Sequence, residues 1–412
     1  MLKELGMRAR EATVITGALT TEEKNRALQT VAEGLVKNSK TILAANEQDM
    51  ANGREKGMSA GLLDRLKLTE ERIVSMAEGI LQVAELTDPI GELLERRERP
   101  NGLTIDKVRV PMGVVGIIFE SRPNVTADAF ALCFKTGNAV ILKGGSDAIH
   151  SNRAITESIQ NSLTCCGIPK DAILLITGTD RETTTEFMKM NAYVDVLIPR
   201  GGAGLIASVV KNSTIPVIET GTGNCHIYID KEADPAKAVP IVINAKTQRL
   251  GVCNACESLV IHAKAAEAIL PLLESALVDK KVEIRADERA CLLMPEAVPA
   301  AQEDYGREYL DAIISVKTVD SPEEAVAHIN QYHTKHSDCI ITENASVAEY
   351  FLNGVDSACV YWNASTRFTD GFEFGFGAEI GISTQKLHAR GPMGLRELTT
   401  YKYLIRGQGQ IR

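Results

Sequence analysis

The sequence lacks long hydrophobic runs, clusters of basic residues and an abundance of aromatic side chains. Aromatic residues make up 5% of its 412 residues, and the net charge is −9. No apolar run approaches the roughly 18 residues that cross a membrane, so we expect no membrane span. The acidic balance without a basic patch argues against nucleic-acid binding. The first ten residues mix acidic and basic side chains in a helical pattern, so we expect no signal peptide.

Cysteine is present but sparse, with nine residues, an odd number. A disulfide-stapled fold needs denser pairs, so we expect a reduced, cytoplasmic protein. Cys253 and Cys256 form a C-x-x-C pair, a spacing that also occurs in metal and redox sites. The sequence has no second such pair, and His226 and His262 lack zinc-ligand spacing, so we expect no metal. Because a free cysteine is most often a small buried core residue, a reactive role needs further evidence.

The hydrophobic pattern predicts an α/β fold. Residues 2–87 have the spacing of amphipathic helices, with capping signals at Thr20 and Thr69. From residue 114 onward, short continuous apolar runs alternate with helical stretches, as in a parallel sheet covered by helices. The runs lie at 114–119, 139–142, 173–176, 194–198 and 216–218, and then at 226–230, 258–262, 313–316, 339–342 and 358–362. Helices are expected between them at 126–136, 148–164, 181–191 and 202–212.

A charged segment around Asn101-Gly102 interrupts this pattern and predicts a surface hairpin. It is too polar for a core strand pair, so we interpret it as an oligomerisation arm, with a plain surface hairpin as the alternative. We therefore expect two doubly wound parallel-sheet domains and a small β arm. The expected parts are a cofactor-binding domain (1–94 and 114–225), the arm (95–113 and 397–412), a catalytic cysteine domain (226–362) and a substrate-loop segment that returns to the cleft (363–396).

Cys253 differs from the other cysteines in its position. It lies among small neighbours just before the apolar run 258–262, so its thiol is expected at the entrance of a buried strand. Glu219, in a glycine-rich turn, ends another apolar run. The order and spacing of Glu219 and Cys253 resemble those of aldehyde dehydrogenases, and this resemblance implies a thiolate nucleophile that forms a covalent acyl intermediate.

Longer motifs carry a family resemblance. They are Pro111–Val125, Lys135–Gly145, Glu219–His226, Val252–Ala255, Val319–Asp338 and Phe372–Pro392. The first two, with the order of Glu219 and Cys253, resemble the aldehyde dehydrogenase superfamily. The others, above all the last, are similar to the γ-glutamyl phosphate reductase family, which acts in proline biosynthesis from glutamate. One departure is His333, where that family usually has Gly or Ser.

The resemblance implies an oxidoreductase that reduces L-glutamyl 5-phosphate to L-glutamate 5-semialdehyde and phosphate with NADPH. It implies that Cys253 attacks the acyl carbon, expels phosphate and holds a thioester that accepts hydride. The side-chain amide of Asn124 and the backbone N–H of Cys253 are the implied oxyanion donors. Glu219 matches the residue that activates water in hydrolytic aldehyde dehydrogenases. Its role here stays open. Glu219 acts as a general base, or it assists the ionisation of Cys253, or its carboxylate is turned away from the reacting atoms.

The resemblance also implies an NADP(H) site formed by Lys143, Gly145, Ser146, Arg200, Gly201, Gly202 and Glu308. Lys143 matches the lysine near the adenosine ribose. Ser146 is neutral where NAD-preferring relatives often have Glu, which favours NADP because a carboxylate repels the 2′-phosphate. The turn of Arg200 precedes a helix and is expected at the pyrophosphate. Glu308 matches the residue that holds the nicotinamide ribose.

The substrate carries two anionic groups, and cations in loops are expected to bind them. The candidates are Arg122, Lys386, His388 and Arg390. The implied partners are the small-molecule substrate, a second copy in a homo-oligomer, and a transient contact with glutamate 5-kinase. Two alternatives remain: a hydrolytic or CoA-acylating aldehyde dehydrogenase, and a non-catalytic scaffold that keeps the fold to bind a kinase.

Overall fold

The chain divides into two compact units, and each is described by itself. The computed structural model describes residues 2–412. Unit 1 contains the chain up to Glu219, Gly375–Gly381 and Met393–Arg412, and unit 2 contains Thr220–Phe374 and Ile382–Pro392. The break therefore falls before Thr220, whereas the sequence pattern placed it after residue 225. The reason is that the turn 220–224 packs within unit 2, where the Gly221 N–H donates to the Ile382 carbonyl at 2.9 Å.

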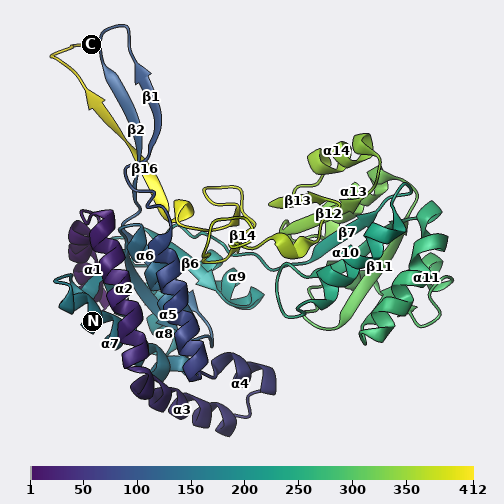
Figure 1. The fold of residues 1–412 in the computed structure, drawn as a ribbon, viewed down its shortest axis with the longest axis horizontal. Coiled ribbons are helices and arrows are strands. Elements are labelled where there is room, and N and C mark those ends of the chain that lie inside the picture. Colours follow the sequence, from purple (N-terminus) through teal and green to yellow (C-terminus); the bar gives the residue numbers. More distant parts are fainter. Residues whose placement is uncertain (1) are drawn as a thin grey trace. The chain divides into compact units, whose positions relative to one another are not determined.

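Unit 1 is a four-stranded parallel sheet with helices around it (Figure 1). Its strands, in the order β5-β4-β3-β6, are β3 (Val114–Phe119), β4 (Ala139–Gly144), β5 (Ile173–Leu175) and β6 (Val196–Arg200). Its helices are α1 (Leu2–Thr16), α2 (Thr21–Lys37), α3 (Ser39–Glu55), α4 (Ala60–Leu66), α5 (Glu70–Glu85), α6 (Asn124–Lys135), α7 (Ile149–Cys165), α8 (Arg181–Phe187) and α9 (Ala203–Asn212).

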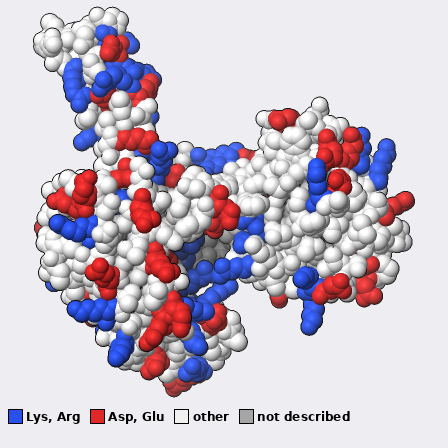
Figure 2. Space-filling view, viewed as in Figure 1, with Lys and Arg blue, Asp and Glu red and all other residues white. Residues whose placement is uncertain are grey.

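The N-terminal helices form as the sequence predicts. Thr20 caps α2: its hydroxyl accepts the Glu23 N–H at 3.2 Å, and the Glu23 carboxylate accepts the Thr20 N–H at 2.8 Å. The predicted capping box is therefore confirmed. Thr69 caps α5 through the Arg72 N–H. On the face drawn in Figure 2, acidic and basic side chains of these helices lie interspersed.

The arm of unit 1 is a three-stranded antiparallel sheet that projects from the helices (Figure 1). It contains β1 (Leu93–Glu98), β2 (Thr104–Pro111) and β16 (Thr399–Arg406). The predicted hairpin is therefore confirmed, and its third strand lies in 397–412, the other segment assigned to the arm. Asp106 is buried in β2 and accepts from Arg96 and Arg406, each at 2.6 Å. Alternate residues of β16 expose the apolar side chains of Tyr401, Tyr403 and Ile405.

Unit 2 is a seven-stranded parallel sheet, which confirms the second doubly wound domain. Its order is β10-β9-β11-β8-β7-β12-β13. The strands are β7 (Cys225–Ile229), β8 (Cys256–His262), β9 (Glu283–Ala286), β10 (Val298–Pro299), β11 (Ile313–Val319), β12 (Ser337–Ile341) and β13 (Cys359–Trp362). The helices are α10 (Pro235–Thr247), α11 (Ala263–Asp279), α12 (Glu288–Cys291), α13 (Pro322–Tyr332) and α14 (Ala345–Gly354).

Alternating side chains of the central strands fill two cores in unit 2. Ile227 and Ile229 pack with residues of α10 and α11, whereas Tyr228 packs with residues of α13 and α14. The Tyr228 ring stacks on Phe351, with centroids 6.0 Å apart. Because successive strand residues point to opposite faces, a continuous apolar run is the sequence of a strand covered on both sides.

Three local expectations differ from the structure. The run 216–218 forms only one parallel bridge, between Val217 and Leu197, and no strand. Helix α8 ends at Phe187 rather than near 191, because the Lys189 and Met190 N–H groups bond three residues back in tight turns. The sequence pattern did not predict β9 or β10, which are short and partly exposed. No helix among residues 2–412 is long and apolar enough to cross a membrane.

Candidate active site

The loop that carries Cys253 joins α10 to β8 in unit 2. Cys253 lies three residues before the first residue of β8 and is half-buried. The Ala255 N–H donates to the Val252 carbonyl at 3.1 Å, which turns the loop at the cysteine. The predicted place of Cys253, at the entrance of a buried strand, is therefore observed.

Two glycine contacts hold the turn 220–224 against this loop. A Cβ on Gly223 would lie 1.5 Å from the Cys253 carbonyl oxygen, so only glycine fits there. The Gly223 N–H donates to Glu308 Oε1 at 2.6 Å. Three segments distant in sequence, around residues 223, 253 and 308, are thus in direct contact within unit 2. Gly223 thus contacts both the Cys253 loop and Glu308, and the role of Glu308 in cofactor binding stays a prediction.

Asn254 fixes the other side of the cysteine. Its Nδ2 donates to the Thr369 carbonyl at 2.9 Å, and its carbonyl accepts the Thr366 hydroxyl at 2.9 Å. Arg367 donates to the Asn254 side chain and, through Nε, to Gln248 Oε1 at 3.0 Å. Burial lowers the pKa of Arg367, and the charge of Arg249 lowers it further. The cysteine therefore sits in a loop clamped at both flanks beside a guanidinium.

The remaining cysteines of the region are less suited to attack. Cys256 is fully buried, and burial raises the pKa of its thiol well above the usual range. Cys225 is also fully buried with a raised pKa, and its thiol donates to the Cys253 carbonyl at 3.2 Å. A protonated thiol is a poor nucleophile, so Cys253 is the best placed of the three. Among residues 2–412, no three metal-binding side chains gather in a metal-like cluster.

The C-terminal motif joins the same unit. Ser383 bridges to Thr220, and a Cβ on Gly221 would lie 2.1 Å from Thr384, so the motif begins beside the turn 220–224. Lys386 and Arg390, predicted to bind substrate anions, both contact Asp356, each at 2.9 Å.

Asp356 is thereby surrounded by positive charge. Lys335 adds a third cation, 3.5 Å from its carboxylate. The contact with Lys386 lowers the pKa of Asp356 most, and the contact with Arg390 lowers it further. Burial opposes these shifts, but the pKa still lies well below its usual range. His388 lies between the two predicted cations with a left-handed φ of 63°, which bends the loop. Three cationic side chains, those of Lys335, Lys386 and Arg390, thus surround one carboxylate. The cluster has a net positive charge and suits an anionic ligand.

His333, the departure from the family pattern, fills a buried polar cluster. Its Nδ1 is 2.8 Å from Asp338 Oδ2, and the Ser357 hydroxyl donates to the same carboxylate. The His226 N–H donates to the other oxygen at 2.7 Å. Burial alone would raise the Asp338 pKa, but the contacts with His226 and His333 hold it well below the usual range. The cluster supports the strands behind the turn at Asn224.

In unit 1, Asn124 is the first residue of α6. Its Nδ2 donates to Asp128 Oδ2 at 3.0 Å, one helical turn away. Burial raises the Asp128 pKa to about 6, although the Asn124 bond and the charge of Arg200 oppose the shift. The contact fixes the amide orientation and leaves one N–H on Nδ2 for a ligand. Arg122 precedes α6 in the same unit and is exposed.

The cofactor residues predicted in unit 1 lie at the ends of β4 and β6. Lys143 is 5% exposed, and its ammonium donates to the Gly144 carbonyl at 3.1 Å. It forms no ion pair with another residue in the range 2–412. Burial lowers its pKa, against the opposing charge of Asp180. A buried ammonium with unused N–H groups fits a ligand that brings hydroxyl or phosphate oxygens.

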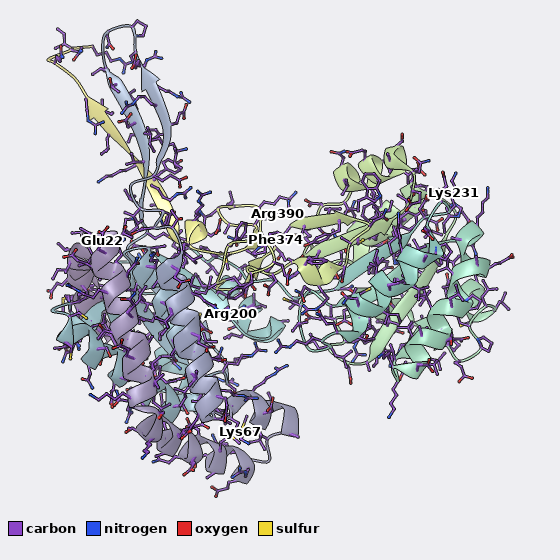
Figure 3. The ribbon with its side chains drawn as sticks, in the orientation of Figure 1. Glu22, Lys67, Arg200, Lys231, Phe374 and Arg390 are labelled. Atoms are coloured by element: carbon purple, nitrogen blue, oxygen red, sulfur yellow. The ribbon has the colours of Figure 1, made fainter. Side chains whose placement is uncertain are left out.

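Ser146 opens a short 3₁₀ helix directly after Gly145. The turn 200–202 ends β6 and leads into α9 (Figure 3). There the Gly202 N–H donates to Glu120 Oε2 at 2.9 Å, so a carboxylate of the protein itself lies at the N-terminus of α9. A pyrophosphate at this turn would use other N–H groups or displace Glu120.

Glu219 is the last residue of the first segment of unit 1, and Cys253 belongs to unit 2. The functional pairing of these two residues, and that of Asn124 with Cys253, stay predictions. The structure adds four residues that the sequence pattern did not indicate: Glu120, Asp128, Asp356 and Arg367. Only Asp128 left a signal, because an acidic residue one turn after Asn124 interrupts an otherwise apolar helix.

Comparison with known proteins gives one family throughout. The aldehyde dehydrogenase family profile matches residues 3–295. A gamma-glutamyl phosphate reductase of Lachnospira eligens is 59% identical over 411 residues, which cover 100% of this chain and 99% of the relative.

Solved structures agree with these sequence matches. The crystal structure of the gamma-glutamyl phosphate reductase of Thermotoga maritima matches with a TM-score of 0.98 and 49% identity, over 100% of this chain and 99% of the other. An acetylating aldehyde dehydrogenase of Geobacillus thermoglucosidasius matches with a TM-score of 0.69 and 18% identity, over 100% and 97% of the chains. This more distant match shows the fold alone.

Proposed function

Because the chain belongs to the gamma-glutamyl phosphate reductases of the aldehyde dehydrogenase family, we propose that it reduces L-glutamyl 5-phosphate to L-glutamate 5-semialdehyde and phosphate. This is the second step of proline biosynthesis from glutamate. The observation that carries the proposal is the match over the whole chain, together with a half-buried Cys253 clamped at both flanks. The proposed reductant is NADPH.

Cys253 is the proposed nucleophile. As a thiolate it attacks the acyl carbon, the C–O bond to phosphate breaks, and a thioester remains on the protein. NADPH, when bound, supplies hydride to that thioester. The Asn124 amide and the Cys253 backbone N–H then stabilise the oxyanion, and cleavage of the C–S bond releases the aldehyde and restores the thiolate.

Cofactor binding is proposed for residues of both units. In unit 1, the buried Lys143 ammonium and the neutral Ser146 would receive the adenosine ribose and its 2′-phosphate. In unit 2, Glu308 would bind the nicotinamide ribose through the oxygen that Gly223 does not use. The glycines at 145, 201 and 202 would allow close approach of the pyrophosphate.

The cluster around Asp356 is proposed to receive a substrate anion. Lys386 and Arg390 would exchange part of their contact with Asp356 for a carboxylate or phosphate. His388 and Arg122 are the further proposed cations. Glu219 keeps no assigned role, because water activation would hydrolyse the thioester and waste the acyl group.

The experiment is the reverse reaction with purified protein. NADP⁺ reduction by glutamate 5-semialdehyde should require inorganic phosphate and should be slower with NAD⁺. Cys253→Ser should abolish it, whereas the folded Cys256→Ser control should retain it. Phosphate-independent NADP⁺ reduction would instead indicate a hydrolytic dehydrogenase, and activity in the Cys253→Ser variant would exclude the assigned nucleophile.

A second proposal concerns assembly. Strand β16 is an edge of the arm sheet, and no other strand among residues 2–412 pairs with its outer side. Its exposed face carries Tyr401, Tyr403 and Ile405, which are 50%, 55% and 62% exposed. An edge with an apolar face is a surface that proteins usually cover. We propose that a second copy of the chain covers it.

A further inference from the structure

A buried ion pair spans the two ends of the Cys253 loop. Lys246 lies in the last turn of α10, and Glu257 is the second residue of β8. Their Nζ and Oε2 atoms are 2.6 Å apart, and both side chains are 0% exposed. The pair thus joins the last turn of α10 to the start of β8, which closes residues 246–257 into a ring.

A gain in folding stability does not explain why the protein contains this buried ion pair. Desolvation of two charges often costs as much as their attraction returns, and apolar replacements of buried pairs are frequently neutral or stabilising. Burial raises the pKa of Glu257, and the Lys246 ammonium opposes that shift. What the pair supplies is a fixed distance between α10 and β8, because separating the two buried charges would leave each of them without a partner.

The second oxygen of Glu257 reaches another segment. Its Oε1 accepts the Leu310 N–H at 3.2 Å. Leu310 has a left-handed φ of 54°, a conformation that a leucine rarely keeps without external support. Two residues earlier, Glu308 accepts the Gly223 N–H, and Gly223 lies against the Cys253 carbonyl. The contacts therefore run in a closed circuit through the three segments.

We propose that the Lys246–Glu257 pair is a positioning device that holds the Cys253 thiol and the Glu308 carboxylate in one fixed arrangement. The proposal deepens the proposed function, since it takes the roles of Cys253 and Glu308 from there. The ion pair fixes the loop of the nucleophile, and the bond to Leu310 extends that constraint to the cofactor residue. Neither Lys246 nor Glu257 touches the reacting atoms in this account.

Two double variants separate the two links. Lys246→Met with Glu257→Gln removes both charges but keeps an acceptor for the Leu310 N–H. Lys246→Met with Glu257→Leu removes the acceptor as well. Neither leaves a lone buried charge, so both are expected to fold. Far-ultraviolet circular dichroism and the melting temperature check this directly.

The expected results differ between the variants. The Met/Gln variant should lose about tenfold or more in kcat, because small displacements of a nucleophile are costly, while the KM for NADPH stays near the parent value. The Met/Leu variant should lose as much kcat and also raise the KM for NADPH several-fold. In both variants, the rate at which iodoacetamide alkylates Cys253 should depend on pH differently than in the parent protein. Mass spectrometry of the Cys253 peptide measures that rate.

Two further variants keep the test decisive. Glu257→Asp retains both charges but is too short to hold Lys246 and Leu310 together, so it should fold and lose kcat in part. Lys317→Met removes another ion pair of unit 2, with Asp287, that touches none of the three segments, and it should change neither kcat nor alkylation. Folded double variants with parental kcat, KM and alkylation profile would overturn the proposal, as would parental behaviour of Glu257→Asp if the double variants do not fold.

The proposed reaction and the proposed role of the Lys246–Glu257 pair are tested by different measurements, so one can be wrong while the other holds. The reaction itself is judged on the parent protein, whose phosphate-dependent activity does not depend on any variant. Alkylation of Cys253 needs no catalysis, so it reports the loop geometry even if the parent acts on another substrate.

Discussion

Two aspartates beside the proposed ligand-binding residues are held in opposite ways. Asp128 contacts Asn124 in unit 1, and burial raises its pKa to about 6. Asp356 contacts Lys386 and Arg390 in unit 2, and those cations hold its pKa well below the usual range. The lowered pKa favours the ionised form of Asp356. Asp128 is the carboxyl near the proposed oxyanion donor whose charge responds to mild acid.

The raised pKa of Asp128 gives a stability prediction with a definite sign. The folded protein binds this proton more tightly than the unfolded chain, whose aspartates titrate near 3.9, so stability falls as the pH rises from about 4 to about 6. Asp128→Asn removes the cost of the charge. It should be more stable than the parent by about 1–2 kcal/mol at pH 8, and the gain should shrink toward pH 4.5.

Thermal unfolding at both pH values measures this difference. Asp180 provides the control, because its pKa is lowered by the Thr183 N–H and hydroxyl at the N-terminus of α8. Asp180→Asn should lose nearly the same stability relative to the parent at both pH values, because a carboxylate with a lowered pKa loses its contribution only below about pH 4. A gain for Asp128→Asn that is equal at both pH values would show that the pKa of Asp128 is not raised in the folded protein.

Ser146 gives a second prediction that rests on a single residue. Ser146→Glu would place a carboxylate near the proposed site of the 2′-phosphate, and like charges about 4 Å apart cost roughly 1 kcal/mol per pair even in water. NADPH efficiency should fall at least about tenfold, with little loss for NADH, whose ribose hydroxyls can bond a carboxylate. Ser146→Gln, neutral and of the same size, is the control. An unchanged ratio of the two efficiencies would mean that Ser146 does not face the ribose.

At the scale of elements, the arm carries its own prediction. Tyr401→Asp with Tyr403→Asp puts two charges on the exposed face of β16, where a second copy is proposed to bind. Sedimentation should find the parent as an oligomer and this variant shifted toward single chains. Lys402→Asp, on the opposite face of the strand, should leave the assembly unchanged. A parent that sediments as a single chain would contradict the proposed role of the arm.

The elements also show what a sequence can predict. Strand β3 and helix α2 follow from local pattern alone, since a doubly buried run and a capping box are readable within a few residues. The position of Cys253 follows in the same way, from small residues before an apolar run. The run 216–218 was misleading, because Val217 pairs with Leu197 alone.

The partners of the site residues were not predictable in this manner. Asp356 meets Lys386 and Arg390 from another loop, and Glu257 meets Leu310 from a distant segment. These contacts exist only once the sheet of unit 2 has formed, and no periodicity in the sequence encodes which loops then touch. The family resemblance supplied residue roles, but it contained no information on the groups that hold those residues in place.

At the scale of the whole molecule, the two units divide the proposed chemistry. Unit 2 holds Cys253, Glu308 and the cations around Asp356, and the contacts of Glu308 with Gly223 and of Arg390 with Asp356 lie within that unit. Unit 1 holds Asn124 and the residues proposed for the adenosine half of the cofactor. The proposed reaction passes through a single covalent intermediate on Cys253.

The most direct test of that central claim omits phosphate. The protein is mixed with NADP⁺ and glutamate 5-semialdehyde, NADPH formation is followed, and the cysteine peptides are then analysed by mass spectrometry. We expect a burst of about one NADPH per chain, a γ-glutamyl adduct on the Cys253 peptide, and turnover that resumes when phosphate is added. Steady NADPH formation without phosphate, or an adduct on any other cysteine, would contradict it.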